Sequence, residues 1–192
     1  MTKQEMDKSL PFLLFLDVDG VLNNQRTFNH TPNGFTGIDD GNLRTFDKAM
    51  SIIEEKTRTV VKIILSSSWK INWKNRGKPN KDGRYLIRAL KMTNHKITGF
   101  TQDDVEKSIY HPGYTRGAGI RRYLESCPHT DYLILDDEPF EFEKEELIDH
   151  FLQTDWRTGL VDEDIKNILA ILDKKPQTKK LKRKHIGISD LR

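Results

Sequence analysis

The stretch FLLFLDVDG, residues 12–20, decides how this chain folds. Five consecutive apolar residues are followed at once by two carboxylates that alternate along the chain, Asp17 and Asp19. A short apolar run that ends in polar residues is typical of a strand buried on both faces of a parallel sheet. We therefore expect both carboxylates at the carboxyl edge of such a sheet, where open α/β folds bind their ligands.

Two further apolar runs, and the segments between them, complete the predicted fold. Val60–Leu65 and Tyr132–Leu135 are typical of buried strands, and Ile97–Thr101 and Phe151–Thr154 are shorter strand candidates. Apolar side chains recur at helical spacing in the remaining segments, which predicts helices over 42–55, 84–92, 117–126 and 162–172. Strands that alternate with helices indicate an α/β fold with a doubly wound, mainly parallel central sheet.

Size and composition fit one soluble domain. The chain has 192 residues, and we expect a single α/β domain over 1–173. The one cysteine, Cys127, excludes an intramolecular disulfide and a four-cysteine zinc site, and it favours a reducing compartment. No apolar run approaches the roughly 20 residues of a membrane span, and the first ten residues do not resemble a signal peptide. These features predict a cytoplasmic protein and leave open delivery into a host cell as an effector.

Positive charge is concentrated at the C-terminal end of the chain. Residues 174–192 contain eight Lys or Arg and one acidic residue, so this segment carries +7 and the remainder −4 of a net charge of +3. An acidic body argues against a nucleic-acid-binding surface that covers the whole fold. Most charge runs are simply solvated, but this basic tail could also contact an acidic surface or link to a further domain.

Asp17 and Asp19 can be given different chemical roles. One carboxylate of such a pair can attack phosphorus as a nucleophile, while the other passes a proton to the leaving oxygen. Gly20 would let the backbone turn away sharply after them. A structural alternative is a strand-end turn or a calcium loop, but the calcium pattern requires a glycine and a glutamate at later positions that this sequence lacks.

Serines follow the second predicted strand in the same way. Ser66 comes directly after Leu65, as Asp17 comes after the first strand, and its hydroxyl could hydrogen-bond a phosphoryl oxygen. A serine after a strand is more often a helix cap, yet the matching position favours a role at the site. Ser67 and Trp69, which follow closely, are further candidates for contact with substrate.

A cation is expected to come from Arg116, at the start of the helix that leads into the third strand. Its planar guanidinium suits phosphate because it can donate two parallel hydrogen bonds. Arg121 and Arg122 lie within that predicted helix and should be solvated, and Lys107 falls in a predicted loop. Arg116 is therefore the preferred candidate.

More carboxylates follow the third strand. Asp136, Asp137 and Glu138 come directly after Leu135, which brings them to the same sheet edge as Asp17 and Asp19. So many acids in one place require a cation. Hard oxygen ligands beside a phosphate substrate favour Mg²⁺ over zinc, which prefers nitrogen and sulfur. We therefore expect a Mg²⁺ site here.

These four elements, in this order, resemble the motifs of the haloacid dehalogenase (HAD) superfamily, whose phosphatases use an aspartate nucleophile. The resemblance spans 12–140, and Gly159-Leu160 is similar to the superfamily's closing segment. It implies a three-layer Rossmann-like fold and Mg²⁺-dependent phosphatase activity. Arginine at 116 instead of lysine, and Val21 instead of the frequent threonine, are departures. Neither departure removes a function that the reaction needs.

The resemblance also implies a role for each candidate residue. Metal ligands would come from the nucleophile's carboxylate, the backbone carbonyl two residues later and one acid of the last motif. The implied roles are Asp17 as nucleophile and metal ligand, Asp19 as general acid and base and metal ligand, Ser66 and Arg116 as phosphate-binding groups, and Asp136 or Asp137 as metal ligand.

The number of residues between the motifs bears on the size of the substrate. The two intervals where superfamily members insert cap domains are about fifty residues each and are largely used by core elements, so no large cap is expected. An open cleft favours a phosphorylated macromolecule. Capless relatives that the sequence resembles include domains of bacterial RNA-repair proteins, the magnesium-dependent phosphatase and bacterial effector phosphotyrosine phosphatases.

Several substrates and one non-enzymatic role stay open. The acidic body ranks phosphoprotein first, with phosphotyrosine favoured, and polynucleotide 3′-phosphate second. A small metabolite or nucleotide comes third. Aromatic residues in or near the segments expected to border the open cleft, such as Trp69, Trp73 and Phe35, could stack on either a tyrosine ring or a base, or could be buried under loops. A different class of protein, an inactive interaction module tethered by its tail, is disfavoured by the complete set of acids.

Overall fold

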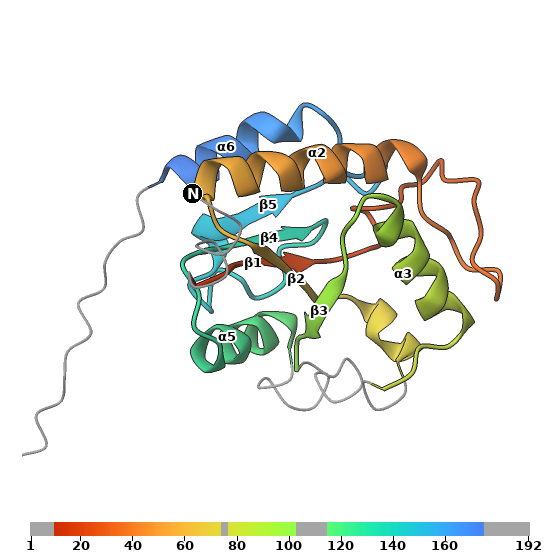
Figure 1. Ribbon diagram of the computed structural model, residues 1–192, viewed down its shortest axis with the longest axis horizontal. Coiled ribbons are helices and arrows are strands. Elements are labelled where there is room, and N and C mark those ends of the chain that lie inside the picture. The colour runs from red at the N-terminus through yellow and green to blue at the C-terminus, as the bar shows by residue number, and fades with distance from the viewer. Residues whose placement is uncertain (1–9, 74–76, 103–114, 175–192) are drawn as a thin grey trace, which may run out of the picture.

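The fold is built on a five-stranded sheet with the strand order β3-β2-β1-β4-β5 (Figure 1). The computed structural model describes residues 10–73, 77–102 and 115–174. All four neighbouring strand pairs in these ranges are parallel. The strands are β1 (Phe12–Leu16), β2 (Val61–Leu65), β3 (Ile97–Phe100), β4 (Tyr132–Asp136) and β5 (Phe151–Gln153). All five predicted strands are therefore confirmed, with ends that move by one residue at most.

Helices cover both faces of this sheet. Figure 1 shows α2 and α6 side by side over one face and α5 on the opposite side. The helices are α2 (Asp40–Thr57), α3 (Lys81–Met92), α5 (Arg116–Ser126) and α6 (Asp164–Asp173), with short 3-10 helices η1 (Ser68–Asn72) and η4 (Ile148–His150). The three-layer Rossmann-like fold is as predicted, and the described ranges contain no large cap domain.

β1 is the strand with the deepest burial because helices pack against both of its faces. All five of its side chains are fully buried. Phe12, Leu14 and Leu16 join the core beneath α2, α3 and α6, whereas Leu13 and Phe15 join the smaller core beneath α5. This alternation is why an uninterrupted apolar run, and not an alternating one, encodes a central parallel strand.

The Asn, Gly, Pro and charged residues of Lys70–Gly83 predict a surface loop, and this prediction is wrong at both ends of the segment. The 3-10 helix η1 covers its first residues, and α3 begins at Lys81. The Asn80 side chain caps α3 by accepting a hydrogen bond from the Gly83 backbone N–H at 2.9 Å. Asn, Asp and Gly here are therefore cap and first-turn residues, although they have the composition of a turn.

The strand order places a topological switch point between β1 and β4. From β1 the chain moves outward through β2 and β3, then crosses to β4 and β5 on the other side of β1. Ligands in open α/β sheets bind in the crevice beyond the carboxyl ends of the strands at such a point. Asp17 follows β1 and Asp136 ends β4, so both border this crevice.

Lys174 is the one residue of the basic tail that the structure describes. Residues 175–192, most of the basic tail, lie outside the described residues, as does Lys107. Lys174 lies within them and its Nζ is 3.6 Å from Asp149 Oδ1 in an exposed ion pair. Among the described helices, none is both long and apolar enough to span a bilayer.

Candidate active site

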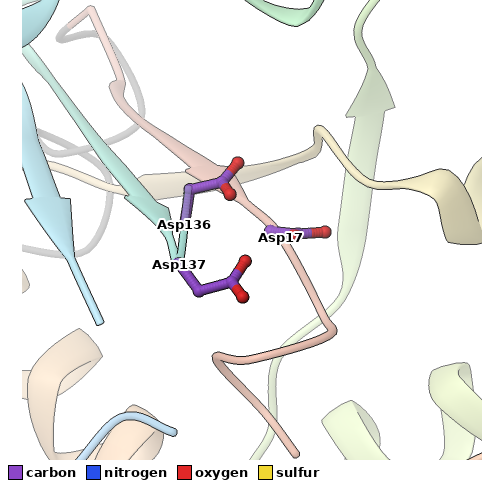
Figure 2. Close-up of side chains that lie close together, drawn as sticks. All are labelled: Asp17, Asp136 and Asp137. Atoms are coloured by element: carbon purple, nitrogen blue, oxygen red, sulfur yellow. The ribbon is translucent and has the colours of Figure 1, made fainter. Parts of the chain in front are cut away.

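Three carboxylates converge at the switch point. One oxygen from each of Asp17, Asp136 and Asp137 lies within 4.8 Å of the other two. Figure 2 shows the side chains of Asp136 and Asp137 extending from the end of β4 toward Asp17, which follows β1. Asp17 and Asp136 are buried, and Asp137 is partly exposed. Acids that are 119 residues apart in sequence are thus gathered by the parallel pairing of β1 with β4.

Arg116 neutralises part of this negative charge. Its Nη1 lies 2.9 Å from Asp17 Oδ2 and 2.5 Å from Asp136 Oδ2, so one nitrogen bridges both carboxylates. The guanidinium also stacks 4.1 Å from the centroid of the Phe140 ring. Arg116 is the first residue of α5, where the Thr115 hydroxyl caps the helix, and this position directs the side chain toward the cluster.

Burial and mutual repulsion make the cluster costly in its ionised form. The pKa of Asp136 is raised to about 8, first by burial and then by the negative charge of Asp17. The same two causes, in the same order, raise the pKa of Asp137 to about 6. Burial also raises the pKa of Asp17, against the opposing charge of Arg116 and a contact with the Ser67 hydroxyl. A second cation beside Arg116 would relieve this penalty.

One carboxylate oxygen of Asp17 has no hydrogen-bond partner among the described residues. Its Oδ1 is buried and has no partner with hydrogen-bond geometry in the part of the chain that the structure describes. A buried acceptor without a partner is costly, so such an atom indicates a ligand. With the oxygens of Asp136 and Asp137, it supplies the hard donor set that Mg²⁺ prefers. The residues present therefore fit a Mg²⁺ ion.

Asp19 is held apart from this cluster by two donors. Trp69 Nε1 donates to its Oδ2 at 3.0 Å, and Asn23 Nδ2 donates to its Oδ1 at 2.8 Å. Trp69 is only 6 % exposed, so its indole N–H is part of the framework that orients Asp19. Asp19 itself is exposed, which leaves its carboxylate accessible to a substrate. Its side chain is not part of the three-carboxylate cluster.

Gly20 allows the backbone after Asp19 to pass close to the cluster. Its φ is +72°, and a Cβ at this position would lie 2.5 Å from the Asp137 carboxylate. The Thr154 hydroxyl donates to the Gly20 carbonyl at 2.7 Å, and Asn23 Oδ1 accepts from its N–H at 3.0 Å. The turn that carries Asp19 is therefore fixed from both sides.

Ser66 and Ser67 are both buried but make different contacts. Ser67 is the N-cap of η1, where its Oγ accepts from the Trp69 backbone N–H at 3.3 Å, and its hydroxyl also lies beside Asp17. Ser66 is in contact with Thr101 through their hydroxyls, 3.5 Å apart. The cap function considered for Ser66 thus belongs to its neighbour. Both serines are buried and follow the carboxyl end of β2.

Three residues at the site were not predicted from the sequence. Asn23 and Thr154 hold the turn of Asp19 and Gly20, and Phe140 stacks on Arg116. Asn23 stands four residues after Asp19, a spacing compatible with a turn, so the sequence contained a signal from which its role could have been predicted. Thr154 and Phe140 gave no comparable signal, because their partners lie far away in sequence.

This fold and this site define a HAD-type α/β domain. The family model described as the HAD domain in Swiss Army Knife RNA repair proteins matches residues 13–165, and the chain belongs to this family. Neither the curated proteins nor the solved structures gave a significant match. HAD enzymes generally use Mg²⁺, and the family supports hydrolase chemistry of the phosphatase type. It gives no support to the phosphotyrosine preference that was ranked first from the sequence.

Proposed function

We propose that this protein is a Mg²⁺-dependent phosphomonoesterase that forms an aspartyl-phosphate on Asp17 and acts on the 3′-phosphate of a nucleic-acid strand. The observation that carries the chemistry is the buried, unpartnered Oδ1 of Asp17 within the three-carboxylate cluster. The choice of substrate is supported by the family, which is described by its occurrence in RNA repair proteins. Ligation that joins a 3′-hydroxyl to a 5′-phosphate is blocked by a 3′-phosphate, so removal of this group suits repair.

In the proposed first step, Asp17 attacks phosphorus. An oxygen–phosphorus bond forms to Asp17, the bond from phosphorus to the leaving oxygen breaks, and Asp19 gives that oxygen a proton. Asp19 is suited to this role because Trp69 and Asn23 fix its orientation while it stays exposed. In the second step Asp19 takes a proton from water, which attacks phosphorus and releases inorganic phosphate and free Asp17.

Other groups would stabilise the negative charge of the transferring phosphate. Mg²⁺ would be held by Asp17, by Asp136 or Asp137 and by the Asp19 backbone carbonyl, and it would supply charge neutralisation. Arg116 forms an ion pair with Asp17 Oδ2 and would donate to a phosphoryl oxygen. Ser66 and Ser67, at the end of β2, are the candidates for a hydroxyl donor to the same group.

A turnover panel tests this proposal. With Mg²⁺ present, we would compare 3′-phosphorylated oligonucleotides with phosphotyrosine peptides, phosphoserine peptides and p-nitrophenyl phosphate. We expect the highest kcat/KM for the oligonucleotides. A higher value for the phosphotyrosine peptide would restore the ranking made from sequence alone, and no release of phosphate from any of the four would refute the phosphatase.

A further inference from the structure

A cleft of about 410 Å³ opens beside Asp19. Its walls include Phe35 and Thr36 from the loop before α2, and Ile71 and Asn72 from η1, which also contains the buried Trp69. The two apolar side chains on these walls are unusually accessible, because Phe35 is 67 % exposed and Ile71 is 85 % exposed. The volume falls at the lower end of the roughly 300–1,000 Å³ typical of small-ligand pockets. The cleft therefore suits one group of about nucleoside size.

The loop that presents Phe35 is braced. The Phe35 carbonyl accepts from the Thr31 N–H at 2.8 Å, and the Phe35 N–H donates to the Thr31 hydroxyl at 3.2 Å. Asp82, which is 2 % exposed, accepts from both the backbone and the side chain of Asn33. Because Asp82 belongs to α3, the loop is tied to the helix beside which it lies in Figure 1.

The position of Asp19 indicates what enters this cleft. In the proposed function, on which this inference rests, Asp19 gives its proton to the leaving oxygen. Because Asp19 also lines the cleft, the group behind that oxygen can enter it. Thr36, Ser68 and Asn72 add polar atoms to the walls. A nucleobase has donors and acceptors along its edge to meet them. A tyrosine ring has only the oxygen that is being released.

We propose that this cleft binds the base of the nucleotide that carries the scissile phosphate, with the base held between Phe35 and Ile71. Single-stranded ends are commonly recognised by stacking of an unpaired base on an aromatic side chain. Phe35 would supply this stacking surface without taking part in the chemistry. The cleft would thereby select a free strand end over a phosphate that lacks a base.

Two oligonucleotides that differ at one position test the proposal. Both carry a terminal 3′-phosphate, one on an ordinary nucleotide and the other on an abasic residue. Phe35→Ala should raise KM for the first about tenfold or more and leave KM for the second unchanged. Phe35→Trp should restore the lower KM. Phe28→Ala is the control, because Phe28 is an even more exposed phenylalanine that does not line the cleft.

The outcomes separate this inference from the proposed function. If both oligonucleotides are hydrolysed and Phe35→Ala shifts their KM values equally, the base site is wrong and the phosphatase stands. If neither oligonucleotide is hydrolysed, the affinity of the protein for each of them, measured by fluorescence anisotropy, still tests the base site. Tighter binding of the base-bearing strand that Phe35→Ala abolishes supports the site. Equal binding of both strands, or a KM effect of Phe35→Ala on a phosphotyrosine peptide alone, overturns it.

Discussion

The carboxylate cluster at the β1–β4 switch point and the cleft beside Phe35 differ in nearly every physical respect. The cluster is buried and charged, and strand ends position it. The cleft is open, its walls are largely neutral, and a surface loop and a 3-10 helix form it. Asp19 lies at the boundary between them. The difference suggests that reaction chemistry and substrate selection reside in separate parts, so that mutations should affect one without the other.

The largest effect is expected from Asp17→Asn, which tests whether the cluster performs the chemistry. Turnover should fall on the order of 10⁴-fold or more, because the nucleophile is lost. The folded state should persist, since the substitution removes a buried charge and almost no volume. Phosphate release and circular dichroism measure the two effects, and Asp173→Asn, at an exposed aspartate that ends α6, is the control. Activity at the wild-type level would eliminate the aspartyl-phosphate mechanism.

Arg116→Ala should damage both stability and turnover. It leaves two buried carboxylates without their shared cation, which typically costs about 3 kcal/mol of unfolding free energy. Loss of a donor to the transferring phosphate should lower kcat about 100-fold. Urea unfolding and steady-state kinetics measure these changes. The control is Arg121→Ala in the same helix, and an identical phenotype there would remove Arg116 from the site.

The metal-free protein should lose stability as pH rises from about 4 to about 8. In this window folded Asp136, whose pKa is about 8, keeps a proton that the unfolded chain has released, so the folded state binds more protons. Mg²⁺ favours the ionised cluster and should flatten this slope. At 100 times its Kd it adds about 2.7 kcal/mol, or roughly 5–10 °C in Tm. Melting curves at pH 5 and pH 8, with chelator or Mg²⁺, measure this; an equal Mg²⁺ effect at both would count against the site.

Trp69→Phe should have the smallest effect, which is confined to the boundary between the two regions. The variant keeps most of the buried ring but loses the hydrogen bond to Asp19, so kcat should fall about tenfold with little change in KM. Trp73→Phe is the matched control, because Trp73 is also buried and lies just beyond η1. If both variants lose the same activity, the indole of Trp69 only packs.

The sequence predicted the cluster better than its surroundings, and the reason is geometric. Asp17 and Asp136 border apolar runs, and parallel strands bring such ends together whatever lies between them. Arg116 could be chosen over Arg121 because it begins the helix, whereas Arg121 lies within it. The bonds to Asp19 depend instead on how a turn and η1 pack in three dimensions, so Trp69 was expected to contact substrate and not to orient a carboxylate.

The strand order also constrains when the site can exist during synthesis. β1 is made first, yet one of its edges stays unpaired until residues 132–136 have emerged and added β4. Until then the chain carries an exposed apolar strand edge, which is a hazard for aggregation. It also cannot hold a divalent ion, since two of the three carboxylates are still absent. Metal affinity should therefore appear only after Asp137 has been synthesised, and a ribosome stalled before residue 132 should carry a nascent domain that Mg²⁺ does not stabilise.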